Sequence, residues 1–180
     1  MGVRRVTTGH DDAGRAVVAS DEAVEAITLA LVPGWEFHRL WGADEAGSFP
    51  DSGERPSAPA YFPPRAGSRF AFFTVPAHNG PGVPDDVDLV GALGEFDEKL
   101  PGMSEHLEVE NPGMHTTATI DYGVVVSGEA TLELDDGVIV VLRPGDTYVQ
   151  NGTRHRWRNH GDVPAVVAVV LIGADHQRVV

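Results

Sequence analysis

A short segment places four polar side chains at alternate positions, in the order His115, Thr117, Thr119 and Asp121. Alternate side chains of a strand point to one face, and in a half-buried strand that face usually carries apolar residues. Imidazole and carboxylate groups can ligate a divalent metal ion or transfer protons. The row therefore predicts a metal site, an acid–base site, or side chains that only satisfy one another's hydrogen bonds.

The composition limits what such a site can serve. A chain of 180 residues with 42% hydrophobic residues fits one globular domain. Its 13 Lys and Arg stand against 27 Asp and Glu, and the net charge of −14 repels nucleic-acid phosphates and anionic lipids. The absence of cysteine excludes disulfides and thiolate ligands. No signal peptide or apolar run of membrane-spanning length is present, so we expect a cytoplasmic protein that binds neither nucleic acid nor membrane.

Most of the chain is typical of short strands joined by turns. VRRVTT and RAVVAS flank the turn-forming GHDDAG, which predicts a hairpin, and RFAFFTVPA predicts a further strand. Residues 43–68, between these segments, are rich in turn-forming and breaker residues and predict a surface loop or a lid. One short helix is expected near residues 85–100, where apolar residues fall at helical spacing.

From residue 107 onward the pattern consists of short strands and turns. ELDDGVIV contains an Asp-Gly pair, which is a strong hairpin signal. Several short strands with almost no helix predict an all-β fold, either a closed antiparallel barrel or a jelly roll. GVVV, VIVVL and AVVAVVLI are apolar on both faces. Both faces must then be covered by the N-terminal strands, by a second subunit or by both, and we expect a homodimer packed sheet on sheet.

Two motifs in the second half of the chain resemble the signature motifs of the cupin superfamily. The first contains His115, Asp121 and Gly128, and the second is PGDTYVQNGTRHRWRN, in which Gln150 stands where proline is usual. The resemblance covers about residues 105–172. It implies a single antiparallel cupin barrel. Proteins of this superfamily have many different activities, so the fold alone does not identify the reaction.

The resemblance also implies a division of the chain. Residues 105–180 form the cupin barrel, and residues 1–104 form an N-terminal β-extension that carries the long loop and the short helix. The extension packs on the barrel, so the chain is one structural domain in total.

Cupins that bind metal use two His and one Glu from the first motif and one His from the second. In this resemblance His115 and His155 keep the first and last places, Asp121 takes the place of Glu, and Thr117 takes the place of the second His. A threonine hydroxyl is a poor ligand for a transition metal. The three remaining ligands imply a site for one divalent ion, Fe, Mn, Zn or Ni, or a metal-free site that relays protons.

Other side chains are candidates for contact with a substrate. Trp157 lies two residues past His155 and points to the same side, although a core position is its commoner use. Tyr148 and Gln150 share one face of the preceding strand, and His38 lies in the apolar segment GWEFHRLWG. The full set of substrate-binding candidates is His38, Thr117, Tyr148, Gln150 and Trp157.

We therefore expect a small-molecule enzyme whose divalent metal, held by His115, Asp121 and His155, supports oxygenation, decarboxylation or lyase chemistry on a carbonyl, enol or carboxylate substrate. One alternative is a metal-free isomerase, cyclase or dehydratase that uses the same His and Asp side chains as acids and bases. Another is a non-catalytic cupin that binds a small ligand. The chain has no nucleotide-binding Gly-rich loop, no G-x-S-x-G elbow and no H-E-x-x-H motif, so it predicts neither nucleotide-driven chemistry nor serine hydrolysis.

Overall fold

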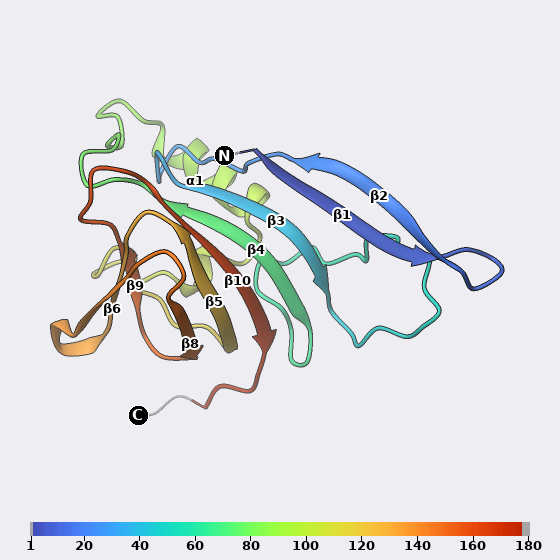
Figure 1. Ribbon diagram of the computed structural model, residues 1–180. Coiled ribbons are helices and arrows are strands. Elements are labelled where there is room, and N and C mark those ends of the chain that lie inside the picture. Colours follow the sequence, from blue (N-terminus) through green and yellow to red (C-terminus); the bar gives the residue numbers. More distant parts are fainter. Residues whose placement is uncertain (1, 178–180) are drawn as a thin grey trace.

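A computed structural model describes residues 2–177, and antiparallel strands dominate it (Figure 1). Strands β1 to β5 are Val3–His10, Ala16–Val24, Glu36–Ala43, Ser68–Val75 and Thr119–Ser127. Strands β6 to β10 are Ala130–Glu133, Ile139–Leu142, Thr147–Asn151, Arg156–Arg158 and Ala165–Gly173. The helix α1 is Leu89–Lys99, and two short 3-10 turns are Ser104–His106 and Asp135–Gly137.

The strands form two sheets and a separate hairpin. One sheet has five strands in the order β3-β4-β10-β5-β8, and the other has three in the order β7-β6-β9. Every named pairing is antiparallel. This arrangement confirms the predicted all-β barrel of the jelly-roll type with one short helix.

The first half of the chain supplies part of the main sheet. Strands β3 and β4 pair with each other, and β4 also pairs with β10, so the five-stranded sheet joins residues from both sides of position 104. The β1–β2 hairpin lies outside this sheet and projects beyond the barrel in Figure 1. The structural barrel therefore begins at β3.

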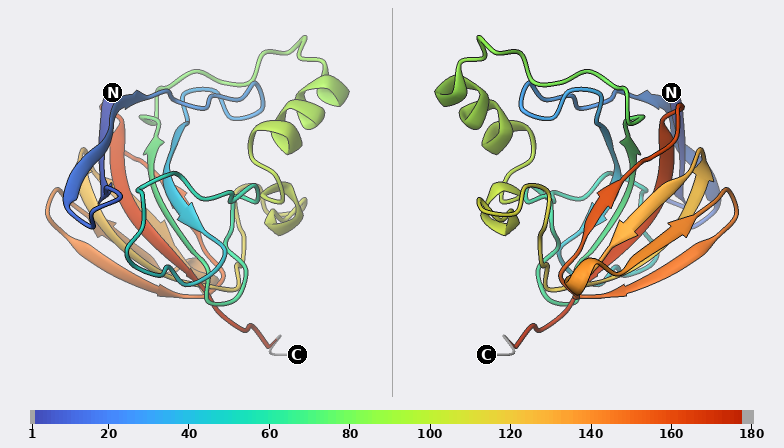
Figure 2. Two further views of the ribbon diagram at one scale, coloured as in Figure 1. Left: turned by 90° about the vertical axis from the view of Figure 1, so that its right-hand side faces the viewer. Right: turned by 90° about the vertical axis from the view of Figure 1, so that its left-hand side faces the viewer.

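The strands bury one face and leave the other exposed. Along β5, residues 119, 121, 123 and 125 are buried, while Tyr122 and Val126 are exposed. The buried faces of the two sheets make the core, and α1 lies beside the open side of the curved sheets in both views of Figure 2. Phe96 of α1 is buried in the same core cluster as residues of β3, β4, β5 and β10. The helix thus closes one side of the space between the sheets.

Local chemistry explains where the predicted turns fall. At the tip of the β6–β7 hairpin, Asp136 and Gly137 have φ values of 56° and 72°. A type I′ turn needs positive φ at both central residues, and Asp-Gly meets this need at little steric cost. At the start of α1, the Asp88 carboxylate accepts a hydrogen bond from the Val90 backbone N–H at 3.2 Å, which caps the first turn.

The long loop between β3 and β4 has no helix or strand over residues 44–67. It is nevertheless tied to the rest of the fold, because the Tyr61 N–H donates to the Pro101 carbonyl after α1 at 2.8 Å and the Tyr61 ring is buried. Within residues 2–177, no helix has both the length and the apolar character required to cross a membrane.

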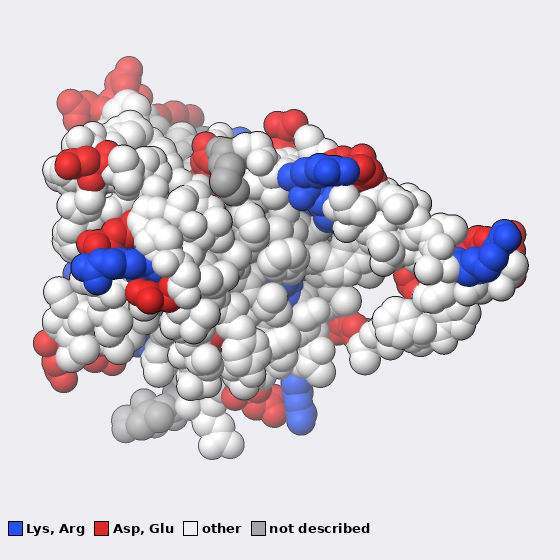
Figure 3. Space-filling model, viewed as in Figure 1, with Lys and Arg blue, Asp and Glu red and all other residues white. Residues whose placement is uncertain are grey.

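The outer face of the five-stranded sheet is apolar and open. Phe70, Tyr122, Val126 and Val149 are each more than two-fifths exposed on β4, β5 and β8. Figure 3, which views the molecule from the side of Figure 1, shows few charged side chains over the middle of this surface. The single chain does not cover this face, so the homodimer stays a prediction.

The dimer can be tested by placing a charge on this face. Val149 pairs with Tyr122 across β8 and β5, so Val149→Asp would place a charge where two sheets are expected to meet. We expect the wild-type chain to sediment at twice the mass of one chain and Val149→Asp to sediment as a monomer. Val109→Asp, which changes a residue 94% exposed in a loop, is the control and should remain dimeric. A monomeric wild-type protein would contradict the prediction.

Candidate functional site

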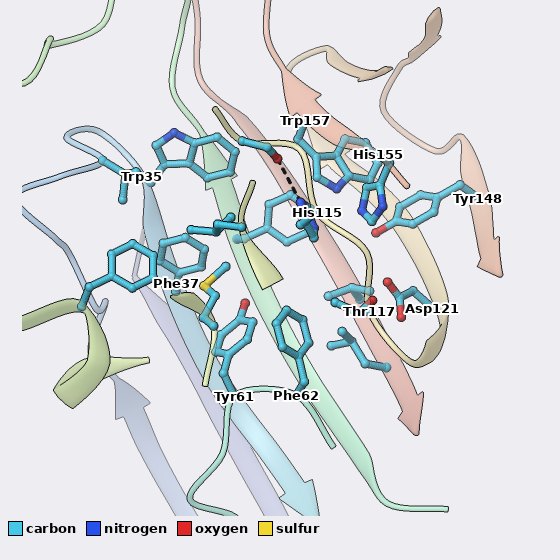
Figure 4. Close-up of a pocket in the computed structure, with 18 residues that line it drawn as sticks. Trp35, Phe37, Tyr61, Phe62, His115, Thr117, Asp121, Tyr148, His155 and Trp157 are labelled. Carbon is cyan, nitrogen blue, oxygen red and sulfur yellow. Dashed lines mark hydrogen bonds between the residues drawn. The ribbon is translucent and has the colours of Figure 1, made fainter. Parts of the chain in front are cut away.

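A cavity of about 160 Å³ lies inside the barrel, between the sheets and the segment around α1. Residues from both halves of the chain line it, and Figure 4 shows their side chains pointing into one space. One wall is aromatic and comes from β3 with the residue before it, from β4 and from the long loop. The opposite wall comes from β5, β8 and β9 and from the segments just before β5 and β9, and it carries the polar groups. The two walls have different chemistry.

The aromatic wall is built from stacked and edge-on rings. Trp35 stacks on Phe37 with ring centroids 6.0 Å apart and on Phe73 at 6.5 Å. The Tyr61 ring meets Phe37 edge-on at 6.1 Å and Phe62 edge-on at 5.0 Å. Burial raises the pKa of the Tyr61 hydroxyl well above its ordinary range, so this hydroxyl stays protonated at neutral pH. The wall therefore presents flat apolar surfaces and one O–H donor.

The opposite wall begins with an aromatic group from β8 and β9. The Tyr148 ring packs on Trp157 with centroids 4.9 Å apart, and Trp157 meets His155 edge-on at 6.3 Å. Gly123 on β5 makes room for this packing, because a Cβ there would lie 2.2 Å from two Tyr148 ring carbons. Burial, with the nearby Asp121 charge, raises the pKa of the Tyr148 hydroxyl, which is therefore a second donor at neutral pH.

Two histidines meet at the edge of this wall. The backbones of His115 and His155 exchange both N–H to carbonyl hydrogen bonds, at 2.9 and 3.0 Å, and their ring centroids are 4.2 Å apart. Nδ1 of His115 lies 3.0 Å from the Gly113 carbonyl oxygen, and Nδ1 of His155 lies 2.9 Å from that of Thr153. A carbonyl oxygen only accepts, so each Nδ1 carries a proton and each neutral ring keeps Nε2 as an acceptor.

The electrostatic surroundings keep both rings neutral. Burial is the main cause that lowers the pKa of His155, to about 4, and the neighbouring His115 lowers it further. Burial also lowers the pKa of His115. At neutral pH the pair therefore accepts hydrogen bonds through Nε2 and carries no charge.

Asp121 is the acidic group of the cavity. Its side chain is 6% exposed, and among the described residues its Oδ1 has no hydrogen-bond partner. Burial raises the pKa of this carboxyl to about 6, and the Thr119 side chain acts in the opposite direction. The Thr119 hydroxyl also lies 2.8 Å from the hydroxyl of Thr117, which lines the cavity. Asp121 is thus a carboxylate of unusually high basicity that faces an apolar space.

The three expected metal ligands line one cavity but do not gather around one point. Residues 2–177 contain no group of three or more His, Cys, Asp or Glu side chains placed to hold a metal ion. In the view of Figure 4, Asp121 lies below Tyr148, His115 and His155. Asp is one methylene shorter than Glu, so it reaches less far from β5 toward the imidazoles. The donor set does not fit a three-ligand metal centre, and the predicted role of these residues as ligands is not supported by their placement.

The structure separates the other predicted contacts. Thr117, Tyr148 and Trp157 line the cavity, whereas His38 and Gln150 do not. His38 is buried on the face of β3 opposite to that of Phe37. Gln150 is buried too, and its amide donates to the Thr153 carbonyl at 3.0 Å and to the Thr153 hydroxyl. That amide shapes the turn between β8 and β9, and Gln150 is not among the residues that line the cavity.

The sequence reasoning missed the aromatic wall. Trp35 and Phe37 precede and follow Glu36 at strand spacing in GWEFHRLWG, so their alternation could have placed them on one face opposite His38. Tyr61 and Phe62 lie in a segment without regular structure, and no periodic signal marks them.

Comparison with known proteins agrees with this fold. A family model described as Cupin domain matches residues 105–171. Phomopsin biosynthesis cluster protein C' of Diaporthe leptostromiformis is 56% identical over 46 residues, which are 26% of this chain and 24% of that protein. The cupin-domain-containing oxidoreductase fogC of Aspergillus ruber is 40% identical over 67 residues, 36% of this chain and 32% of that protein. The matched segments span only about a quarter to a third of these relatives.

Among solved structures, the polyketide cyclase RemF of Streptomyces resistomycificus is 14% identical, with a TM-score of 0.45 over 86% of this chain and 82% of that one. Similarity at this level concerns the general arrangement of strands. The chemistry of the cavity must be argued from its own residues.

Proposed function

We propose that this chain, which carries a match to the cupin domain at residues 105–171, is a small-molecule enzyme that transfers a proton on an uncharged, planar carbonyl compound. The reaction class is isomerisation, cyclisation or dehydration, and Asp121 is the base. The observation that carries this proposal is the buried Asp121 in the lining of the cavity, whose Oδ1 has no hydrogen-bond partner among the described residues.

The lining of the cavity defines the substrate class. None of its lining residues is a Lys or Arg, so a substrate carboxylate or phosphate would be buried there without a cation and beside Asp121. The aromatic rings on both walls favour a flat, apolar molecule with a polar edge. Of the carbonyl, enol and carboxylate substrates expected from the sequence, the carbonyl and enol compounds fit and the carboxylates do not.

The proton transfer can be written without an oxidant. The Asp121 carboxylate takes a proton from a carbon next to the substrate carbonyl. The electron pair of the broken C–H bond forms a C=C bond to the carbonyl carbon, and the π pair of the C=O bond moves to the oxygen. The Tyr148 hydroxyl, protonated at neutral pH, donates a hydrogen bond to that oxygen as charge develops on it. Protonated Asp121 then returns the proton to another atom, or a substrate hydroxyl leaves as water.

The histidine pair orients the substrate in this proposal. Nε2 of His115 and of His155 each accept a hydrogen bond, since Nδ1 is the protonated nitrogen. They therefore suit a substrate hydroxyl or an enol O–H, and they do not suit a bare carbonyl. A hydroxylated ring system would satisfy this edge of the cavity.

The relatives support a role in small-molecule metabolism. Those cited above are named as a protein of the phomopsin biosynthesis cluster and as an oxidoreductase. Each shares only part of its length with this chain, so neither name fixes the reaction here.

Hydrogen–deuterium exchange tests the proposal directly. We expect the protein in D2O to accelerate exchange of the protons next to the carbonyl of a fused-ring ketone such as 2-tetralone by about 10²–10⁴-fold, the usual range for general base catalysis. Proton NMR measures the loss of signal. Protein treated with a chelator should show the same rate, because the proposed step uses only side chains.

Two results would contradict the proposal. Binding of the ketone without accelerated exchange would indicate a ligand-binding protein. Exchange that is lost on chelation and returns with a divalent metal would indicate the metal-dependent enzyme that the motif resemblance implies.

A further inference from the structure

A second cavity, of about 180 Å³, lies at the other end of β3 and β4 and is lined by three arginines. Arg39 comes from β3, Arg69 from β4 and Arg55 from the long loop. The indole of Trp41 and the backbone of residues 56–59 complete the lining. We refer to this as the arginine cavity. None of its three arginines lines the cavity that contains Asp121.

The positive charge of the arginine cavity is poorly compensated, in a chain whose net charge is −14. Arg69 pairs with Asp44 at 2.6 Å. Among the ion pairs of residues 2–177, none involves Arg39 or Arg55. Glu22 and Glu25 line an adjoining hollow with both, and Glu54 lines a further hollow with Arg55, but none of the three carboxylates forms an ion pair with Arg39 or Arg55. Within residues 2–177, Asp44 is thus the one carboxylate that pairs with a guanidinium group of the arginine cavity.

Backbone carbonyls supply the other contacts. Arg39 donates to the carbonyls of Ala58, Pro59 and Ala60 at 2.5 to 3.0 Å, and Arg55 donates to the Arg39 carbonyl at 3.0 Å. These bonds anchor the long loop to the sheet but bring no formal negative charge. Burial lowers the pKa of Arg39, and the charges of Arg69 and Arg55 lower it further, which is the mark of mutual repulsion.

The backbone is shaped around these side chains. At Gly42 on β3, a Cβ would lie 2.8 Å from Cδ of Arg69 and 3.2 Å from Cβ of Ala58. A side chain there would displace the Arg69 stem or the loop. The glycine therefore lets the aliphatic part of Arg69 pass beneath the loop, and Arg69 as a whole is only 4% exposed.

We propose that the arginine cavity binds a small anion that carries a phosphate group. Two or more negative charges would balance the uncompensated guanidinium groups, and the planar donor fork of arginine matches phosphate oxygens. The site is separate from the proposed catalytic cavity, and it does not depend on the proton-transfer reaction. Its occupant would hold Arg55, and with it the long loop, against β3.

Binding of inorganic pyrophosphate tests this site. We expect pyrophosphate, at constant ionic strength, to raise the melting temperature of the full chain and to give a saturable heat in titration calorimetry. Arg55→Gln should weaken that affinity at least tenfold. Arg55 is exposed, and its side chain bonds only to a backbone carbonyl within the described part of the chain, so this variant should fold normally. Circular dichroism checks this.

A matched control comes from the same loop. Arg65 is exposed, pairs with Asp175 at 3.3 Å and does not line the arginine cavity. Arg65→Gln removes the same charge from the same segment and should leave pyrophosphate affinity unchanged. Equal weakening by both variants would show a general effect of net charge, and no saturable binding by the wild-type chain would show that the arginines serve only to anchor the loop. Either result overturns the proposal.

Discussion

Asp121→Asn is expected to abolish proton transfer and to stabilise the fold at neutral pH. The carboxylate is the proposed base, so its amide should lower the exchange rate by at least about 10²-fold, the contribution usual for a positioned base. The amide also removes a buried charge. Burial raises the pKa of Asp121 from 3.8 to about 6, and at about 1.4 kcal/mol for each pKa unit the charged form costs the folded state about 3 kcal/mol. NMR exchange and urea unfolding measure the two effects.

The pH dependence identifies the group responsible. Asp121 must be ionised to act as a base, so the exchange rate of the wild-type protein should fall as the pH drops through about 6. Asp86→Asn, which removes an exposed carboxylate before α1, is the control and should change neither rate nor pH profile. An Asp121→Asn variant that keeps the wild-type rate would contradict the assignment of the base.

The unfolding free energies of the wild-type protein and of Asp121→Asn should diverge with pH in a defined window. Because the pKa of Asp121 is raised in the folded state, its protonation gives stability that is fully present below pH 3.8 and is lost as pH rises through about 6. The gain in unfolding free energy of Asp121→Asn over the wild type should therefore be absent below pH 3.8 and largest above pH 6. His155 acts in the opposite sense. Its pKa is lowered from 6.5 to about 4, so its contribution is complete above 6.5 and is lost as pH falls through about 4. Asp121→Asn isolates this second transition.

Much of the fold could be predicted because its turns carry strong local signals. Asp136-Gly137 supplies the positive φ values of its hairpin, and the helical spacing before Pro101 matches α1 at Leu89–Lys99. The contribution of β3 and β4 to the main sheet could not be predicted, since the pairing of β4 with β10 joins residues about 90 to 104 positions apart and depends on no local signal. Residues 1–104 were expected to be an extension because the family resemblance covers only about residues 105–172.

The candidate site was predicted in its polar part and missed in its aromatic part. One cavity is lined by the polar residues that the sequence singled out, which are His115, Thr117, Asp121 and His155. Strand alternation and the motif spacing both predict that these side chains face the interior. Their exact separation depends on side-chain length and on how far β5 and β9 approach, which spacing does not encode. Tyr61 reaches the cavity only because the long loop returns across the barrel.

Gly123→Ala is expected to displace Tyr148 and so to disturb the proposed catalytic cavity. The added Cβ would lie 2.2 Å from Tyr148 ring carbons, and the ring is held on its other side by Trp157 at 4.9 Å. Overpacking of this kind costs about 1–3 kcal/mol, and a displaced Tyr148 hydroxyl could no longer donate to the substrate oxygen. We expect lower stability in urea, together with a lower exchange rate.

A double-mutant cycle separates this cause from a general defect of β5. Tyr148→Ala removes the clashing ring, so in that background Gly123→Ala should cost much less stability, with a coupling of about 1 kcal/mol or more. Gly94→Ala in α1 is the matched control. No atom lies within 4 Å of its added Cβ, and helix propensity alone should make it neutral or stabilising by up to about 1 kcal/mol. If Gly123→Ala lowers the free energy of unfolding equally with and without the Tyr148 ring, then the glycine is needed by the strand itself. The space that it leaves for Tyr148 would then have no part in shaping the cavity.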